Sequence, residues 1–327
     1  MAILMKRIPH PLKWGDSGNS LLVLRSESPG RPIRFVFSNR VSSVLRSPAD
    51  TIQLSNGVRM PCLGIGSWQV PEGNALLNSL SDAIHAGYRL IDTASIYGNE
   101  RAVGIAMRNS GVPRSDFFLV DKVWNADRGY EKTLEAFRKS TALLGTSYLD
   151  LYMIHWPATH EEPITCQAIN AGTWRALEKL YRDGSVRAIG VSNFLPHHLV
   201  PLLARAEITP MVNSLEFHPG YPQFQALRFS HEHGMKVLGW APLGRGALME
   251  DPLLQSIAAK HGKTVPQVAL RWALEHGVVP VPKSTSKAHI EENASIFDFT
   301  LPLDEMRAID RLPLTAFTGL DPDTVNY

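Results

Sequence analysis

The 327-residue chain has only two cysteines, Cys62 and Cys166, too few for a disulfide framework or a four-cysteine zinc site. So few cysteines are usual in a reducing compartment. The sequence also lacks any apolar run near the roughly 18 residues that a transmembrane helix needs. We therefore expect no membrane association, and the cytoplasm is the expected location.

An excess of basic residues beyond the N-terminal segment is missing as well, although the formal net charge of the chain is +2. Residues 1–49 hold eight of the 33 lysines and arginines but only two of the 31 acidic residues. The rest of the chain therefore carries 25 basic and 29 acidic residues. Because nucleic-acid-binding proteins usually present a basic stripe, we expect no nucleic-acid partner.

The leader, residues 1–49, is rich in serine and arginine, poor in acidic residues and interrupted by five prolines. This composition is typical of an organelle transit peptide, which would place the protein in mitochondria. A disordered tail, or a start placed too far upstream, is the alternative. The long apolar centre of a secretory signal is absent.

The region from residue 50 to 327 alternates between strand-like and helical patterns and is predicted to form one domain. It opens with a hairpin, because Asn56-Gly57 separates two short alternating runs. Eight apolar strand-like runs follow, at residues 61–66, 88–94, 117–124, 149–156, 186–193, 211–218, 236–243 and 278–283. Helical periodicity falls between them, at residues 74–86, 99–109, 130–144, 173–182, 199–206, 223–232, 265–275 and 288–294.

Eight such units predict a single parallel (β/α)8 barrel, the TIM barrel. Two further helices are expected at residues 249–262 and 303–312. A doubly wound sheet is the alternative, but its dinucleotide fingerprint is missing. Gly64-Ile65-Gly66 is followed by Gln69 where a third glycine would be required.

Polar residues stand where several of the predicted strands end. In a parallel barrel these ends meet at one face, which is where active sites are built. Taken singly, each could be an ordinary rim residue or part of a structural ion pair. Together they suggest an acid-base site, because apolar neighbours surround Lys122 and His155 and an unpartnered polar group there would be costly. The group consists of Asp92, Tyr97, Lys122, His155, Ser192 and Asn193.

A metal site built from Asp92, His155 and Glu216 is a competing interpretation. It has little support, since no CxxC and no helical His-x-x-x-His pair is present. We therefore predict no bound metal.

At this point the residues resemble those of a known family, the aldo-keto reductases, over about residues 51–327. The branch of prostaglandin F synthases and diketogluconate reductases is the most similar. Four motifs carry the resemblance: Gly87-Tyr88-Arg89 with Asp92-Thr93-Ala94, Glu100 and Gly104; Ile154-His155-Trp156-Pro157; Gly190-Val191-Ser192-Asn193-Phe194; and Glu216-Phe217-His218-Pro219.

The resemblance implies reduction of an aldehyde or ketone carbonyl by hydride from NADPH. Tyr97 would be the general acid, and His155 would orient and polarise the substrate oxygen. A tyrosine with an ordinary pKa of about 10 is a sluggish acid near neutrality. Lys122 would lower that pKa, with Asp92 holding Lys122 in place.

The resemblance also implies where the cofactor would bind. Gly66, Ser67, Trp68 and Asp92 would lie near the nicotinamide, which Trp240 would stack against. Ser192, Asn193 and Ser214 would hold its carboxamide, and Leu243, Gly244 and Gly246 would follow the pyrophosphate. The 2′-phosphate and adenine would be held by Lys283, Ser284, Thr285, His289, Glu292 and Asn293.

Three positions depart from the family pattern. Ser214 replaces a usual glutamine and Ala241 a common serine, so two hydrogen bonds to the cofactor would be lost. His289 replaces an arginine that normally grips the 2′-phosphate. Arginine is a permanent cation, whereas histidine is largely neutral at pH 7, so we expect a weakened and pH-sensitive preference for NADPH over NADH.

The substrate side is less defined. Trp68, Trp124 and Trp156 are expected to wall an aromatic mouth that the short tail leaves open, although aromatic core filling is the other interpretation. Small aldehydes, quinones and lipid-derived carbonyls would all suit such a mouth, and we expect the enzyme to act as a monomer.

Two other classes of function remain possible on the sequence. A barrel isomerase or aldolase would use Lys122 as a Schiff-base nucleophile. A non-catalytic nicotinamide-binding or structural protein would account for the three altered cofactor positions.

Overall fold

A two-stranded hairpin precedes the barrel in the computed structural model, which describes residues 45–325. Strands β1 (Thr51–Gln53) and β2 (Arg59–Pro61) pair antiparallel, with Ile52 opposite Met60. Gly57 takes a positive φ of 86° in the turn, which glycine adopts without strain. The predicted hairpin is therefore confirmed.

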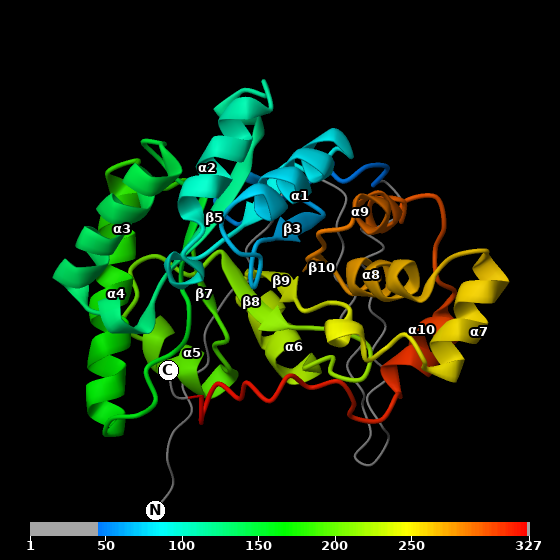
Figure 1. Cartoon of the computed structure of the whole chain (residues 1–327). Coiled ribbons are helices and arrows are strands. Elements are labelled where there is room, and N and C mark those ends of the chain that lie inside the picture. Colours follow the sequence, from blue (N-terminus) through cyan, green and yellow to red (C-terminus); the bar gives the residue numbers. More distant parts are fainter. Residues whose placement is uncertain (1–44, 326–327) are drawn as a thin grey trace, which may run out of the picture. The chain divides into compact units, whose positions relative to one another are not determined.

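Eight parallel strands form a nearly closed barrel, as predicted (Figure 1). Each strand pairs with its neighbours in sequence order. The amide N–H of Gly66, at the end of the first strand, donates to the carbonyl of Pro282 just after the last, at 2.9 Å. The strands are β3 (Gly64–Gly66), β4 (Leu90–Asp92), β5 (Phe118–Val123), β6 (Leu151–Ile154), β7 (Ile189–Ser192), β8 (Val212–Glu216), β9 (Lys236–Trp240) and β10 (Val278–Val281).

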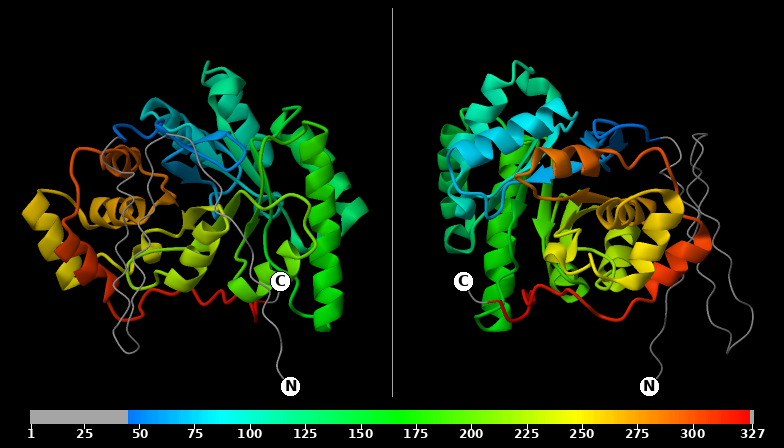
Figure 2. Two further views of the ribbon diagram at one scale, coloured as in Figure 1. Left: turned by 180° about the vertical axis from the view of Figure 1, so that it is seen from behind. Right: turned by 45° about the vertical axis from the view of Figure 1, so that its right-hand side comes forward.

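The helices lie outside the strands in all three views (Figures 1 and 2). Eight follow the strands: α1 (Asn74–His85), α2 (Glu100–Asn109), α3 (Tyr130–Leu144), α4 (Pro163–Arg182), α5 (Pro196–Leu203), α6 (Phe224–Glu232), α8 (Val265–Glu275) and α9 (Lys287–Ala294). The two extra helices are α7 (Pro252–His261) and α10 (Leu303–Asp310). Within the described residues, no helix is long and apolar enough to span a membrane.

Several element boundaries differ from the prediction by a few residues, and two of the differences bear on how the chain is divided. Helix α4 begins at Pro163, ten residues before the predicted start. The run predicted as the first barrel strand is divided, because Pro61 ends the hairpin strand β2 and the barrel strand begins only at Gly64.

The first described residues precede the predicted start of the domain at residue 50. Residues 45–50 already pack against the barrel, where the Cys62 thiol donates to the Ser47 carbonyl at 3.4 Å. Most of the leader proposed for residues 1–49 lies outside the described residues.

The chain continues after α10 as a tail, residues 311–325, without helix or strand. It runs from α10 past α6 toward α5 and is drawn in red (Figure 1). Its Thr315 amide donates to the carbonyl of Gly220 at 3.1 Å. Since all eight strands are parallel, their carboxyl ends open on one face, and it is there that the site is built.

Candidate active site

A cavity of about 1240 Å³ lies at the carboxyl ends of the barrel strands. Most of the residues predicted for the site share its wall. They are Gly66, Trp68, Asp92, Tyr97, Lys122, Trp124, His155, Trp156, Ser192, Asn193, Ser214, Trp240, Leu243, Gly246, Lys283, Ser284, His289, Glu292 and Asn293.

The Lys122 ammonium forms the charged centre of this wall. It donates to both carboxylate oxygens of Asp92, each at 2.7 Å, and to the Thr93 carbonyl at 2.9 Å. Asp92 and Lys122 come from the adjacent strands β4 and β5 and are both buried. Burial raises the pKa of the Asp92 carboxyl, and the Lys122 charge opposes that rise. Three protein oxygens therefore surround the nitrogen and can accept all three hydrogens of an ammonium.

Tyr97 is placed over this pair by a short 3-10 helix, Ser95–Tyr97, directly after β4. The Ser95 hydroxyl donates to the Lys122 carbonyl at 3.1 Å, which ties the turn to β5. Gly98 then ends the turn with a left-handed φ of 65°. The Lys122 ammonium lies 5.4 Å from the centroid of the Tyr97 ring, so a positive charge faces the phenol.

His155 is the third polar group at this end of the cavity. Its ring lies edge-on to Tyr97 and Trp124, with centroids 5.7 and 5.2 Å away. Burial and the nearby Lys122 charge lower the pKa of His155 well below its usual range. The imidazole is therefore neutral at pH 7 and can donate a single N–H to a bound oxygen.

An amide and an indole form the next part of the wall. The Trp240 indole N–H donates to the Asn193 side-chain oxygen at 2.8 Å. The Asn193 amide nitrogen donates to the His155 carbonyl and the Ser192 hydroxyl, both at 3.1 Å. Asn193 thus fixes the Trp240 ring relative to the strand that carries His155. Its oxygen keeps one acceptor site for a ligand.

The far end of the cavity is more polar and more exposed. Lys283 follows β10 and is exposed, while Ser284 is buried, with its hydroxyl accepting from the Ser286 amide at 3.1 Å. His289 is exposed, and Glu292 accepts from the Thr264 hydroxyl at 2.7 Å. The Lys283 cation and the hydroxyl groups near the start of helix α9 make this end of the cavity suitable for binding an anion.

Three residues predicted to bind the cofactor are not on the cavity wall. The Ser67 side chain is fully buried, and its hydroxyl donates to Asn99 at 3.4 Å. Gly244 is buried, and a Cβ there would lie 2.8 Å from the Ala316 Cβ. Thr285 is exposed, next to the wall residue Ser284.

Glu216, weighed above as a metal ligand with Asp92 and His155, also lies off this wall. Its carboxylate instead accepts from the backbone and hydroxyl of Thr318 at 3.0 and 2.8 Å. Glu216 therefore anchors the tail, and the metal site weighed for these three residues does not form.

The wall also contains residues that the sequence did not single out. Arg245 has a left-handed φ of 52°, and its guanidinium lies 4.6 Å from the Trp68 ring. The sequence could have indicated this residue, because Arg245 is a cation between two glycines in the turn after β9. Leu320, from the tail, carried no such signal.

The wall fits an extended nicotinamide dinucleotide. The cavity is larger than the roughly 300–1,000 Å³ of typical drug-sized sites. One end presents the indole Trp240 beside neutral hydrogen-bonding side chains, as a planar ring with a carboxamide requires. Arg245 and Lys283 supply cations farther along, as phosphates require.

Comparisons with known proteins agree with this geometry. Residues 62–313 match the model of the aldo/keto reductase family. The chain is 50% identical over 278 residues to glyoxal reductase of Bacillus subtilis, covering 85% of this chain and 98% of that protein. It is 48% identical over 275 residues to 9,11-endoperoxide prostaglandin H2 reductase of Trypanosoma cruzi, covering 83% and 94%.

Solved structures give the same result. An aldo/keto reductase from Brucella melitensis is 45% identical and superposes with a TM-score of 0.75, covering 81% of this chain and 98% of its own. A mutant of Gox0644 in complex with NADPH is 36% identical, with a TM-score of 0.78 and coverage of 85% and 98%.

Proposed function

Because the chain belongs to the aldo/keto reductase family, we propose that it reduces aldehyde or ketone carbonyls to alcohols with NADPH. The observation that carries this proposal is the cluster of Asp92, Lys122, Tyr97 and His155 on one wall of a large cavity. A buried cation beside a phenol and a neutral imidazole is suited to handling a proton at a carbonyl oxygen.

Each of the four side chains has a distinct part in the proposed reaction. A nicotinamide held on this wall would supply the hydride that the carbonyl carbon receives. Tyr97 gives its hydroxyl proton to the carbonyl oxygen, and the Lys122 ammonium stabilises the phenolate that remains. Asp92 keeps Lys122 in place through its two short contacts. His155, neutral because it is buried, donates a hydrogen bond that orients and polarises the same oxygen.

The rest of the wall would hold the cofactor. Trp240 offers a face for the nicotinamide, with Ser192, Asn193 and Ser214 near its carboxamide. Arg245 and the backbone around it would follow the pyrophosphate, and Lys283 would be the main cation for the 2′-phosphate. Ser214 has a shorter side chain than the glutamine of the family pattern, and Ala241 lacks the hydroxyl of the common serine. Both changes leave fewer hydrogen bonds to the cofactor than the family pattern provides.

The decisive variant is Tyr97→Phe, because it removes one hydroxyl and preserves the ring. We expect kcat to fall by about 10²–10⁴, the usual contribution of a general acid. NADPH affinity, measured by titration of cofactor fluorescence, should stay within about two-fold of wild type. Turnover is followed as loss of NADPH absorbance with short dicarbonyls, aromatic aldehydes, aliphatic aldehydes and quinones.

Other outcomes separate the alternatives. Equal rates for wild type and Tyr97→Phe would remove Tyr97 from the chemistry. A wild type that binds NADPH but turns over no member of the panel would favour the non-catalytic role. Trapping of a substrate on Lys122 by borohydride would instead indicate Schiff-base chemistry.

A further inference from the structure

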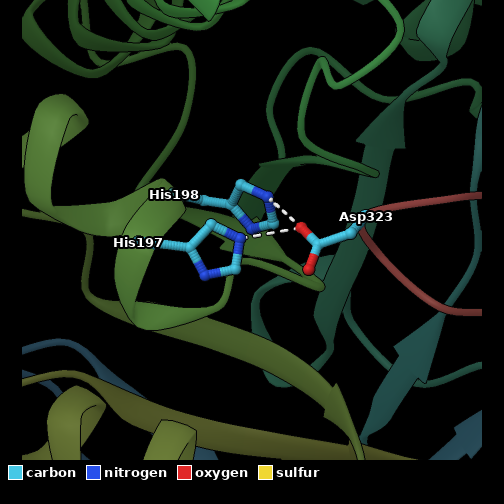
Figure 3. Close-up of side chains that lie close together, drawn as sticks. All are labelled: His197, His198 and Asp323. Atoms are coloured by element: carbon cyan, nitrogen blue, oxygen red, sulfur yellow. Dashed lines mark hydrogen bonds and ion pairs between the residues drawn. The ribbon is translucent and has the colours of Figure 1, made fainter.

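Two adjacent histidines in the first turn of α5 meet an aspartate of the tail (Figure 3). The Nε2 atoms of His197 and His198 lie 2.7 and 2.9 Å from the same carboxylate oxygen of Asp323. The side chain of His198 is only 9% exposed, against 59% for His197 and 46% for Asp323. The three residues border a second cavity of about 240 Å³.

A metal ion could be held by two imidazoles and a carboxylate, but the hydrogen bonds of His198 argue against it. Its Nδ1 accepts from the backbone N–H of Leu195 at 3.1 Å. A neutral imidazole that accepts at Nδ1 carries its proton on Nε2, the atom that faces Asp323. A metal-bound histidine has the opposite arrangement, with the proton on the nitrogen away from the metal. The cluster is therefore built as a hydrogen-bonded anchor.

The charge state of His198 supports the same conclusion. Burial, with a smaller effect of the neighbouring His197, lowers the pKa of His198 to about 4. His198 is then neutral at pH 7 and serves as an N–H donor to the Asp323 carboxylate. The exposed His197 contact adds little, because water screens exposed pairs.

The tail has other fixed points around this anchor. Upstream, Thr318 donates twice to the buried carboxylate of Glu216 at the end of β8. Downstream, the His160 ring contacts the carbonyl of Val325. Pro322, next to Asp323, is buried.

Leu320 lies between these fixed points and forms part of the wall of the large cavity. One anchor, Thr318, contacts Glu216 at the end of β8, and the other, Asp323, contacts α5, which follows β7, the strand next to β6. His155 and Trp156 directly follow β6 and belong to the carbonyl end of the cavity. Leu320 therefore borders the region where the substrate chain would extend.

We propose that His197, His198 and Asp323 are positioning residues that fasten the tail so that Leu320 forms an apolar wall for the substrate chain. The inference rests on the proposed carbonyl reductase function. It assigns the selection of long apolar carbonyl compounds over short ones to a cluster that does not line the large cavity.

The test compares propanal with nonanal in Asp323→Ala, with Thr324→Ala as the matched control. Thr324 is exposed and contributes only its backbone N–H to the tail's hydrogen bonds. In Asp323→Ala the KM for nonanal should rise about five-fold through loss of one partly buried leucine contact. The KM for propanal, and kcat for both aldehydes, should stay within about two-fold. Thr324→Ala should match wild type.

Two further variants distinguish positioning from general damage. Asp323→Asn keeps an oxygen that accepts from His198, so it should restore most of the affinity for nonanal. Leu320→Ala should reproduce the effect of Asp323→Ala, and the double variant should be no worse than either single variant. Equal KM changes for both aldehydes, or additive effects in the double variant, would overturn the proposal.

A readout without turnover separates this inference from the proposed function. Calorimetric binding of nonanol in the presence of NADP⁺ should show the same five-fold loss in Asp323→Ala, and amide exchange of residues 316–325 should accelerate. A wild type that reduces no aldehyde but shows both changes would reject the reductase function and keep the anchor. Micromolar zinc binding that Asp323→Ala abolishes would make the cluster a metal site and reject the anchor.

Discussion

At the residue scale, the contact between Asp92 and Lys122 sets the charge of the site. The Lys122 ammonium donates to three acceptors, and Asp92 supplies two of them. Removing one partner of a buried pair leaves the other charge without compensation. The pair therefore has a structural role that can be measured apart from catalysis.

Asp92→Asn is expected to lower the free energy of unfolding by about 3 kcal/mol, since Lys122 stays buried without its carboxylate. Urea unfolding at pH 7 would measure this. Glu135→Gln is the matched control, because its pair with Lys139 lies at 2.6 Å on an exposed helix surface. That variant should unfold like wild type, as exposed pairs contribute little. Similar losses in both variants would contradict the assignment.

His289 provides a second prediction, about the choice of cofactor. The ratio of NADPH to NADH affinity should be modest in the wild type, because an imidazole lacks the fork-shaped, permanently charged contact that a guanidinium makes with a phosphate. His289→Arg should raise this ratio. Affinities for both cofactors come from fluorescence titration of the two proteins at one pH. An unchanged ratio in His289→Arg would exclude His289 from the phosphate site.

Strand-end polarity made most of these residues predictable from the sequence. Asp92, Lys122 and His155 each interrupt an apolar run, which marks a polar group with a partner or a function. Ser67 was less predictable, because its position next to Trp68 does not reveal that its hydroxyl turns to Asn99. Leu320 could not be found, since its place depends on contacts of Thr318 and Asp323 with distant elements.

At the scale of elements, Gly104 explains why a motif glycine stands inside helix α2. A Cβ at this position would lie 2.1 Å from the carbonyl oxygen of Leu144, at the end of α3. The two helices approach so closely that only a hydrogen fits. This glycine is therefore a packing residue, although the motif that contains it also carries Asp92.

Gly104→Ala is expected to destabilise the protein by about 1–3 kcal/mol, because backbone atoms of α3 must move. Gly172→Ala is the matched control in α4, where a Cβ would meet the Tyr130 nitrogen at an ordinary 3.8 Å. It should instead stabilise by about 0.5–1 kcal/mol, as alanine favours helices over glycine. Thermal unfolding of the two variants would show shifts of opposite sign, and shifts of the same sign would refute the packing argument.

Helix α4 shows the limit of periodicity at this scale. Its C-terminal half has an apolar stripe, including Trp174, Leu177 and Leu180, and was predicted. Its first ten residues, from Pro163 to Gly172, contain a proline, a cysteine and a glycine, which weaken any helical pattern. Proline at the first helical position is in fact favourable, and packing of Cys166 and Asn170 extends the helix.

At the scale of the whole barrel, alternation of eight strands and helices was sufficient to predict the architecture. Barrel closure was not visible in the sequence, since it depends on contacts between the first and last strands, such as the hydrogen bond from Gly66 to Pro282. Neighbouring polar residues on one strand also have different environments, because successive side chains point to opposite faces of the sheet. On β5, Lys122 joins the cavity while the preceding Asp121 is fully buried and carries no part of its wall.

Asp121 gives the barrel a buried carboxyl that holds a proton. Its Oδ1 accepts from the Lys122 amide at 2.8 Å, whereas its Oδ2 and the Oε1 of Glu100 have no hydrogen-bond partner among the described residues. Burial, and next the charge of Glu100, raise the pKa of Asp121 well above its usual range. The folded protein therefore keeps a proton that the unfolded chain releases above about pH 4.

This raised pKa and the lowered pKa values of two histidines act on stability in opposite directions. The Asp121 contribution is present at low pH and is lost as pH rises toward the folded pKa. Neutral His155 and His198 favour the folded state above about pH 6.5, and their contribution is lost as pH falls toward their folded pKa values. Between about pH 4 and pH 6.5 the contributions of Asp121 and of the two histidines to stability therefore change with pH in opposite directions.

Asp121→Asn isolates one side of this balance, because it keeps the shape and removes the titration. Its free energy of unfolding relative to wild type should increase from pH 5 to pH 8, by up to about 1.4 kcal/mol per pH unit. Urea unfolding at pH 5, 6.5 and 8 would measure the difference. Asp150→Asn is the control: that aspartate is equally buried but pairs with Arg114 and Arg187 at 2.7 Å. Its loss should destabilise the protein at all three pH values, and a pH-independent difference for Asp121→Asn would show that Asp121 holds no proton.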